Sequence, residues 1–209
     1  GQLDEEKTYE TMRATLARHE YAVIPGFYGC MPIGTIKTFT RGGSDVTGSI
    51  VASAVNADLY ENWTDVSGFM MADPRIVEHP LSIDTITYRE LRALSYMGAT
   101  VLHEEAIFPV RNAGIPINIR NTNAPADKGT MIVANTNDYD QEHIITALSG
   151  KKGFSVITIE KDKMSSDISF VRRLLEVLED NDIALEHIPS GIDTISLILS
   201  TAALEGRGE

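Results

Sequence analysis

The chain is short of cysteine, of basic residues and of long apolar runs, and each shortage excludes a class of protein. A single cysteine, Cys30, excludes an intrachain disulfide and a cysteine-based zinc site, and it is compatible with a reducing compartment. Lys and Arg number 18 against 30 Asp and Glu, and nucleic-acid binding needs clustered basic side chains, so we expect no nucleic-acid partner. No apolar run approaches the roughly 20 residues of a membrane helix, so we expect a cytoplasmic protein with no membrane partner.

The remaining composition is that of a folded globular protein. The chain has 209 residues, 43% of them hydrophobic and 23% charged, which suits one large domain or two small ones. The first residue is Gly1 rather than methionine, and the first 20 residues read as the continuation of a longer sequence. We therefore expect a fragment.

Residues 1–134 alternate between helical and strand-like patterns. Apolar side chains at helical spacing predict a helix over residues 4–19, capped by Asp4. Further helices are predicted from Ser44, from Tyr88 and from His103, the last interrupted or ended near Pro109. The stretch 21–29 predicts a short apolar strand closed by Pro25 and Gly26, and further strands are predicted at 34–40, 59–69, 115–121 and 129–135. This alternation indicates an α/β sandwich of helices around a mostly parallel sheet.

The polar stretch 135–143 separates a second part, which we place at residues 140–209. Strands are predicted at 154–160, 183–188 and 194–200, with a helix between the first two. An apolar stripe from Ile168 to Leu178 marks that helix, with Ser165 or Ser166 as its N-cap. The order β-α-β-β is most of a ferredoxin-like unit.

A first candidate site is the Arg-Gly-Gly-Ser-Asp motif at residues 41–45. Its glycines free backbone N–H groups at the start of a helix, where a carboxylate or phosphate binds well. Arg41 can clamp a carboxylate and Asp45 can hold an ammonium group, so the motif fits the two charged ends of an amino acid. The alternative is an ordinary turn in which Ser44 caps the helix and Asp45 complements its dipole.

A second candidate site follows the strand predicted at 59–69. Thr64, Asp65, Asp73 and Arg75 lie in one loop, and ligands of open α/β sheets bind beyond the carboxyl ends of strands. Threonine and aspartate can bond a base or ribose, and Arg75 can meet a phosphate. The alternative is a proline-anchored surface turn closed by its own side-chain bonds.

The two motifs in this order resemble the aspartate kinases of the amino-acid kinase family. The matching segments are "TFTRGGSDVTG", "ENWTDVSGFMMADPR", "YRELRALSYMGATVLHEEAI" and "GIPINIRNTNAPADKGTMI". The stretches "KKGFSVITIEKDKM" and "IALEHIPSGIDTISLIL" look like that family's first ACT regulatory domain. The resemblance implies the C-terminal part of a kinase domain at 1–134 and a partial ACT domain at 140–209.

The resemblance also implies an activity and its site residues. The family phosphorylates the side chain of L-aspartate with ATP and Mg²⁺ to give 4-phospho-L-aspartate, on the route to lysine, threonine and methionine. Phosphoryl transfer relies on positioning, so no residue is assigned as a catalytic nucleophile or metal ligand. The implied aspartate-binding residues are Arg41, Gly43, Ser44 and Asp45. The implied nucleotide-binding residues are Thr64, Asp65, Met70, Asp73, Arg75, Thr100 and Val101.

This sequence departs from the family pattern in three places. Met70 stands where many members carry tyrosine, and Thr100 where many carry lysine. The family's N-terminal glycine-rich phosphate loop with its lysine is not found in these 209 residues. We therefore expect the chain alone to be inactive.

In the second part the resemblance implies an amino-acid effector, lysine or threonine. The matching positions are Met164, Ser169, Phe170 and Glu186. The alternative places Phe170 in the core of a helix and leaves Glu186 exposed on a strand. Pairing of ACT-like edges implies a homodimer or a higher homo-oligomer.

Two other functions stay open at this point. A noncatalytic amino-acid-binding regulatory subunit would explain the missing phosphate loop, but it has no need of the motif at 41–45. A kinase of the same superfamily with a carbamate, glutamate or nucleotide substrate would not need the ACT-like segment.

Overall fold

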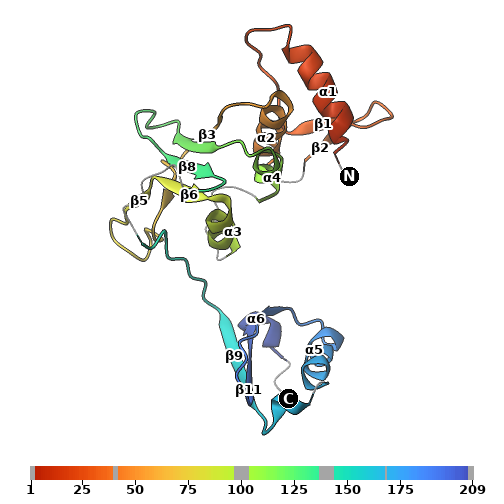
Figure 1. The fold of residues 1–209 in the computed structure, drawn as a ribbon, viewed down its shortest axis with the longest axis vertical. Helices are drawn as coiled ribbons and strands as arrows, with labels where there is room; N and C mark the ends of the chain where they lie inside the picture. Colours follow the sequence, from red (N-terminus) through yellow and green to blue (C-terminus); the bar gives the residue numbers. More distant parts are fainter. Residues whose placement is uncertain (1–2, 40–41, 97–103, 137–143, 168, 207–209) are drawn as a thin grey trace. The chain divides into compact units, whose positions relative to one another are not determined.

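The computed structural model describes residues 3–39, 42–96, 104–136, 144–167 and 169–206, and divides the chain into two compact units (Figure 1). The first unit is Gly1–Gly150 and the second is Lys151–Glu209. Within the described ranges, no helix combines the length and the apolar character needed to cross a membrane.

A four-stranded sheet forms the centre of the first unit. Its strands are β3 (Tyr60–Thr64), β7 (Ile117–Asn121), β8 (Thr130–Val133) and β6 (Thr85–Thr87), in that spatial order. The pairs β3–β7 and β6–β8 are parallel, and β7–β8 is antiparallel. Isoleucines on β6, β7 and β8 are fully buried and form the middle of the core. The predicted α/β class with mostly parallel pairing is confirmed.

In the described part of the first unit this sheet is accompanied by the helices α1 (Glu5–Leu16), α2 (Gly43–Val55), α3 (Tyr88–Tyr96) and α4 (Glu104–Ala113). Asp4 caps α1 as predicted, because its carboxylate accepts a hydrogen bond from the Lys7 amide. The centre of the packing is α2, which contacts α1, α4 and β3. A Cβ at Gly48 would lie 2.6 Å from the Tyr60 hydroxyl, so this close approach of α2 to β3 requires glycine.

The prediction that Pro109 interrupts or ends its helix is wrong. Helix α4 continues past Pro109 to Ala113. The packing of α4 against α2 supports this turn, and the Ser49 hydroxyl accepts a hydrogen bond from the Val110 amide at 3.3 Å. The Ser49 side chain of α2 therefore provides a hydrogen-bond acceptor for the backbone amide that directly follows the proline.

Two small antiparallel hairpins complete the first unit. Strand β1 (Tyr28–Cys30) pairs with β2 (Ile36–Thr38), and β4 (Phe69–Met70) pairs with β5 (Ser82–Ile83). The short strand predicted before Pro25 and Gly26 is wrong, because residues 21–27 pair with no strand in the described parts of the chain and β1 begins only after these two residues. Tyr21 is 86% exposed and Val23 is 99% exposed. Strand β2 is also shorter than predicted and is exposed throughout rather than half-buried.

The second unit has the β-α-β-β order that the sequence predicts. Its elements are β9 (Phe154–Glu160), the 3₁₀ helix η1 (Met164–Ser166), α5 (Phe170–Asp180), β10 (Leu185–His187), β11 (Thr194–Ser200) and the short α6 (Thr201–Leu204). The antiparallel sheet has the order β10-β11-β9. Alternate residues of β11, among them Leu197, are buried with Met164 and Leu178 in a separate core.

The N-cap predicted for the helix of the second unit is wrong. Ser165 and Ser166 belong to η1, and Ser169 occupies the N-cap of α5. The chain turns between the two helices, where the Phe170 amide donates to the Asp167 carbonyl at 3.0 Å. Ion pairs of the Asp167 carboxylate with Lys161 and Arg173 hold this turn, which a helical pattern alone does not reveal.

Candidate functional site

The two glycines at the start of α2 serve different purposes. Gly42 is the N-cap in the left-handed conformation, with φ of 55°. Gly43 is buried, and a Cβ there would lie 2.6 Å from Phe27 Cδ2 and 2.9 Å from Phe39 Cβ. Ser44 is the second residue of the helix and is exposed, so the alternative in which it caps α2 is wrong. The first turn of α2 begins without a capping side chain on its N-cap residue.

The carboxylate of Asp45 is oriented by a buried residue of β3. Asn62 is only 7% exposed, and its side-chain amide donates to Asp45 Oδ1 at 2.9 Å and to the Tyr60 hydroxyl at 3.1 Å. The Tyr60 hydroxyl in turn donates to the Asp45 carbonyl at 3.3 Å. Burial raises the pKa of Tyr60, and the nearby charge of Asp45 raises it further, against the lowering effect of Asn62. Neutral donors therefore fix Asp45 without cancelling its charge.

Asn62 is a site residue that sequence reasoning missed. A signal existed, because Asn62 is a polar residue at the middle of the strand Tyr60–Thr64, on the face that alternation turns toward the core. Arg41, the other charged member of the first motif, lies outside the described residues, as do Thr100 and Val101.

The second motif begins where β3 ends. The Thr64 carbonyl accepts hydrogen bonds from the Thr122 amide at 2.8 Å and from the Thr122 hydroxyl at 2.9 Å. The Thr64 hydroxyl donates to the carboxylate of Asp65 at 3.2 Å. The loop after the neighbouring strand β7 thus holds the start of this loop, at the carboxyl ends of two parallel strands. This is the edge at which α/β sheets bind ligands.

The chain returns to the sheet through a close contact with Thr130. Gly68 has φ of 91°, and a Cβ there would lie 2.3 Å from the Thr130 hydroxyl oxygen. That hydroxyl accepts from the Phe69 amide at 2.8 Å and donates to the Ile83 carbonyl at 2.6 Å. One buried side chain therefore holds both strands of the β4–β5 hairpin, which we define as residues 69–83.

The turn of the β4–β5 hairpin carries an exposed ion pair. Arg75 Nη2 lies 2.7 Å from Asp73 Oδ2, and the Arg75 amide donates to Asp73 Oδ1 at 2.8 Å. The hydrogen bonds from Arg75 lower the pKa of Asp73 to about 2. These are the local bonds of a surface turn, and an exposed ion pair of this kind contributes little to the stability of the fold. Met70, in the adjacent strand, is exposed.

Polar side chains that the sequence analysis did not single out line the same edge. The Ser67 hydroxyl donates to Asp127 at 2.6 Å and accepts from the Asn121 amide at 2.9 Å. The Arg120 guanidinium lies 4.8 Å from the centre of the Trp63 ring and pairs with Glu61. The Ser67–Asp127 contact joins the loops after β3 and β7, and the Arg120 contacts join the two strands themselves. All of them depend on distant segments that no local pattern brings together.

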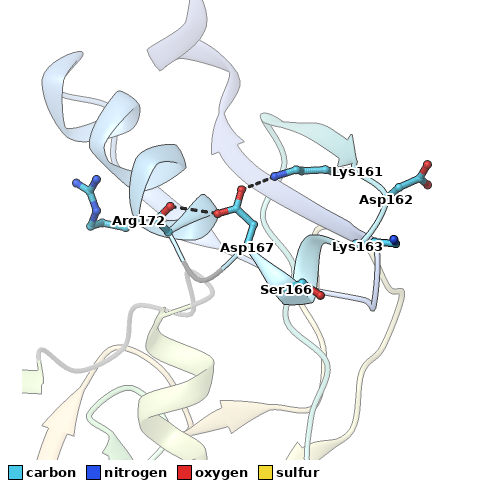
Figure 2. A pocket seen from close by; sticks show the side chains of 7 residues that line it. Lys161, Asp162, Lys163, Ser166, Asp167 and Arg172 are labelled. Carbon is cyan, nitrogen blue, oxygen red and sulfur yellow. Dashed lines mark hydrogen bonds and ion pairs between the residues drawn. The ribbon is translucent and has the colours of Figure 1, made fainter.

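A separate open basin of about 720 Å³ lies in the second unit (Figure 2). Asp167 lies at its centre, where it pairs with Lys161 and Arg173 and accepts a hydrogen bond from Ser169. These contacts, above all that of Lys161, hold the pKa of Asp167 far below its usual range. The lining residues are Lys161, Asp162, Lys163, Ser166, Asp167, Ser169 and Arg172.

The structure distributes the four predicted effector residues over different places. Ser169 lines the basin, whereas Met164 is buried in the core of the second unit. Phe170 packs against that core with the Lys161 ammonium 4.6 Å from its ring centre. The Phe170 amide already donates to the Asp167 carbonyl at 3.0 Å, so this amide has a partner within the chain. Glu186 lies half-exposed on β10.

The fold and the first-unit site together define a class of α/β proteins that bind small ligands at the carboxyl ends of parallel strands. The chain belongs to the amino acid kinase family, whose model matches residues 2–121.

The comparisons with individual proteins agree with that family. The chain is 40% identical to aspartokinase 3 of Bacillus subtilis over 203 residues, which are 97% of this chain and 44% of that protein. It is similar to an aspartate kinase of Clostridium acetobutylicum, described as an allosteric enzyme, with a TM-score of 0.87 and 56% identity over 98% of this chain and 47% of that one. The chain therefore spans less than half the length of the relatives it matches.

Two structures of E. coli aspartokinase III are also similar. One, in complex with lysine and aspartate, has a TM-score of 0.68 and 26% identity, over 97% of this chain and 45% of that chain. The other, in complex with aspartate and ADP, has a TM-score of 0.60 and 28% identity, over 85% of this chain and 39% of that chain.

Proposed function

We propose that this chain is part of an aspartate kinase, which transfers a phosphoryl group from ATP to the side-chain carboxylate of L-aspartate. The product, 4-phospho-L-aspartate, would enter the synthesis of lysine, threonine and methionine. The observation that carries this proposal is the hydrogen bond from Asn62 to Asp45. It fixes the amino-acid motif of α2 to the strand that runs, two residues later, into the loop proposed for the nucleotide.

L-Aspartate would bind at the start of α2. Asp45 is oriented to accept the ammonium group, and the amides of Gly43 and Ser44 at the helix start favour a carboxylate. Arg41, from the same motif, is the proposed clamp for the α-carboxylate. Aspartate is bound in both E. coli aspartokinase III structures, which supports this substrate.

ATP would bind along the edge formed by the loops after β3 and β7. Thr64 and Asp65 offer oxygens for the ribose or base, and Arg75 offers a guanidinium for phosphate once it leaves Asp73. Met70 on the β4–β5 hairpin, together with Asp73, Thr100 and Val101, completes the proposed set. Mg²⁺ would accompany the nucleotide and neutralise its phosphates, and the protein's part is to position the two reactants. The ADP complex of the E. coli enzyme supports a nucleotide here.

The second unit would serve as an ACT-type regulatory domain that binds lysine or threonine. Lysine is bound in one E. coli aspartokinase III structure, which supports an amino-acid effector. In this chain we propose Met164, Ser169, Phe170 and Glu186 for that site, the contribution of Met164 being limited to its backbone because its side chain is buried. We also propose a homodimer or a higher homo-oligomer.

A noncatalytic regulatory subunit is the second candidate. The basin in the second unit favours it, because an amino-acid sensor needs only a site of this kind. Calorimetric titration distinguishes the two candidates. An aspartate kinase fragment binds L-aspartate and MgADP, and Asp45→Asn weakens aspartate alone. Binding of lysine or threonine with no response to aspartate or nucleotide would instead establish the sensor.

The proposed catalytic role also predicts the behaviour of the isolated chain. Without a phosphate loop, 209 residues should release no ADP from ATP in a coupled assay with L-aspartate. Substantial aspartate-dependent turnover would contradict the assignment of 1–134 as only the C-terminal part of a kinase domain.

A further inference from the structure

A segment after the sheet lies across two elements of the first unit. Residues 144–148, here called the strap, form neither helix nor strand. The Thr146 hydroxyl donates to Glu90 Oε1 at 2.7 Å, although the two residues are 56 positions apart in the chain. Since the neighbouring Ala147 packs against the main hydrophobic core, the strap is held by both a polar and an apolar contact.

Glu90 is a rigid anchor for this contact. Its Oε2 accepts from the Thr87 amide at 2.9 Å and from the Thr87 hydroxyl at 2.6 Å, while the Glu90 amide lies 3.2 Å from that hydroxyl. This is a capping box at the start of α3. Burial works against the charge of Glu90, but the hydrogen bonds from Thr146 and Thr87 lower its pKa below the usual value. Because the capping box uses Glu90 Oε2, the Oε1 atom is available to accept the hydrogen bond from Thr146.

The second anchor of the strap is Met71, which directly follows β4. The Leu148 amide donates to the Met71 carbonyl at 2.7 Å, and the Met71 amide donates to the Leu81 carbonyl at 2.8 Å. The backbone of Met71 is thus hydrogen-bonded through its amide to Leu81 of the hairpin and through its carbonyl to Leu148 of the strap. The strap joins the end of β4 to the start of α3.

The position of Met71 connects the strap to the proposed nucleotide residues. Met70 precedes it and Asp73 follows two residues later, both in the β4–β5 hairpin. We propose that the strap positions this hairpin for the nucleotide, with Thr146 and Glu90 as positioning residues that do not touch the ligand. This inference rests on the proposed function, because it concerns the same nucleotide site.

The strap also leads into the second unit within a few residues. Only Ser149–Gly153 separate Leu148 from the start of β9. The strap is therefore the last described part of the first unit to bind its core before the chain continues into the second unit.

The test compares three variants at the strap. Thr146→Val keeps the shape of the side chain and removes its hydroxyl, Thr146→Ser restores the hydroxyl, and Ile144→Ala changes an exposed strap position. Hydrogen exchange is measured on peptides covering residues 69–83, and the affinity for MgADP by calorimetry. Loss of one hydrogen bond to a charged carboxylate should make exchange about tenfold faster and MgADP binding about tenfold weaker in Thr146→Val. Thr146→Ser and Ile144→Ala should match the unmodified chain.

The outcomes separate this inference from the proposed function. If hydrogen exchange in the hairpin is unchanged in Thr146→Val, the strap does not hold the hairpin and the proposal is wrong. Faster exchange with unchanged MgADP affinity would also contradict it, because the strap would then not position the hairpin for the nucleotide. If the unmodified chain fails to bind MgADP, the proposed nucleotide site is overturned and the strap's role in it falls as well. Leu148→Pro, which removes the donor to Met71, should reproduce the effect of Thr146→Val through the second anchor.

Discussion

Asn62 donates its side-chain amide to the Asp45 carboxylate at 2.9 Å, and this contact joins helix α2 to strand β3. The pair lies where two segments of different function meet. Asp45 belongs to the motif proposed for the amino acid, and Asn62 precedes the loop proposed for the nucleotide by two residues. A geometry that serves both ligands therefore depends on a buried neutral side chain.

Substitution of Asn62 should weaken aspartate binding. Asn62→Leu keeps the approximate volume but removes the donor to Asp45, so the carboxylate loses its fixed orientation. A hydrogen bond to a charged group contributes about 1.5–3 kcal/mol, so aspartate affinity should fall at least about tenfold. Calorimetric titration with L-aspartate measures this, and Asn123→Leu, at an exposed loop position, is the matched control. Equal affinity in both variants would show that Asn62 does not orient Asp45 for a ligand.

Gly43 should tolerate no side chain. In Gly43→Ala the new Cβ would press on Phe27 and Phe39, and strain of this kind costs about 1–3 kcal/mol. The free energy of unfolding in urea measures the loss. Gly29→Ala is the control, because a Cβ at Gly29 would have no atom within 4 Å. A Gly43→Ala protein as stable as Gly29→Ala would mean that α2 does not pack against these two rings in solution.

Thr130 should be essential to the β4–β5 hairpin. In Thr130→Val the Phe69 amide and the Ile83 carbonyl both lose their partner in a buried place, and each such group costs about 1–3 kcal/mol. The urea midpoint should therefore drop clearly. Thr38→Val, on the exposed strand β2, should leave it unchanged. A similar midpoint for the two variants would argue against the Thr130 contacts.

The Asp73–Arg75 pair predicts a specific titration. The pKa of Asp73 is lowered to about 2, so its pairing with Arg75 stabilises the folded state at pH values above the ordinary carboxyl pKa. This stabilisation is lost as the pH falls through about 2 and Asp73 takes up a proton. The carboxyl carbon resonance of Asp73, followed by NMR, should titrate near that value. Arg75→Gln should return the midpoint to about 4, the ordinary value for aspartate. A midpoint near 4 in the unmodified chain would show that the pair does not persist in solution.

Elements with a strong local period could be predicted from the sequence. Helix α2, predicted from Ser44, begins at Gly43, and β11 alternates along Thr194–Ser200 as predicted, because both patterns depend on neighbours in the chain. The short strand predicted before Pro25 and Gly26 did not form, since a strand also requires a partner. The N-cap at Ser169 was missed because it depends on how Asp167 binds Lys161 and Arg173.

The candidate site could be predicted only in part, for a similar reason. Residue types and order indicated Asp45, Thr64 and Asp73, whose proposed roles rest on charge and on position after a strand. Asn62 and Thr130 act through partners 17 and 61 positions away, respectively, and no local spacing reveals such contacts. Resemblance to a family supplies the roles of residues but not these supporting bonds.

The apolar segment at residues 21–36 has a practical consequence for work with this chain. Tyr21, Val23, Ile33 and Ile36 all present most of their side-chain surface to water. Large exposed apolar surfaces promote association, so the chain should cluster as its concentration rises. Sedimentation over a dilution series would establish the range in which titrations report on single molecules.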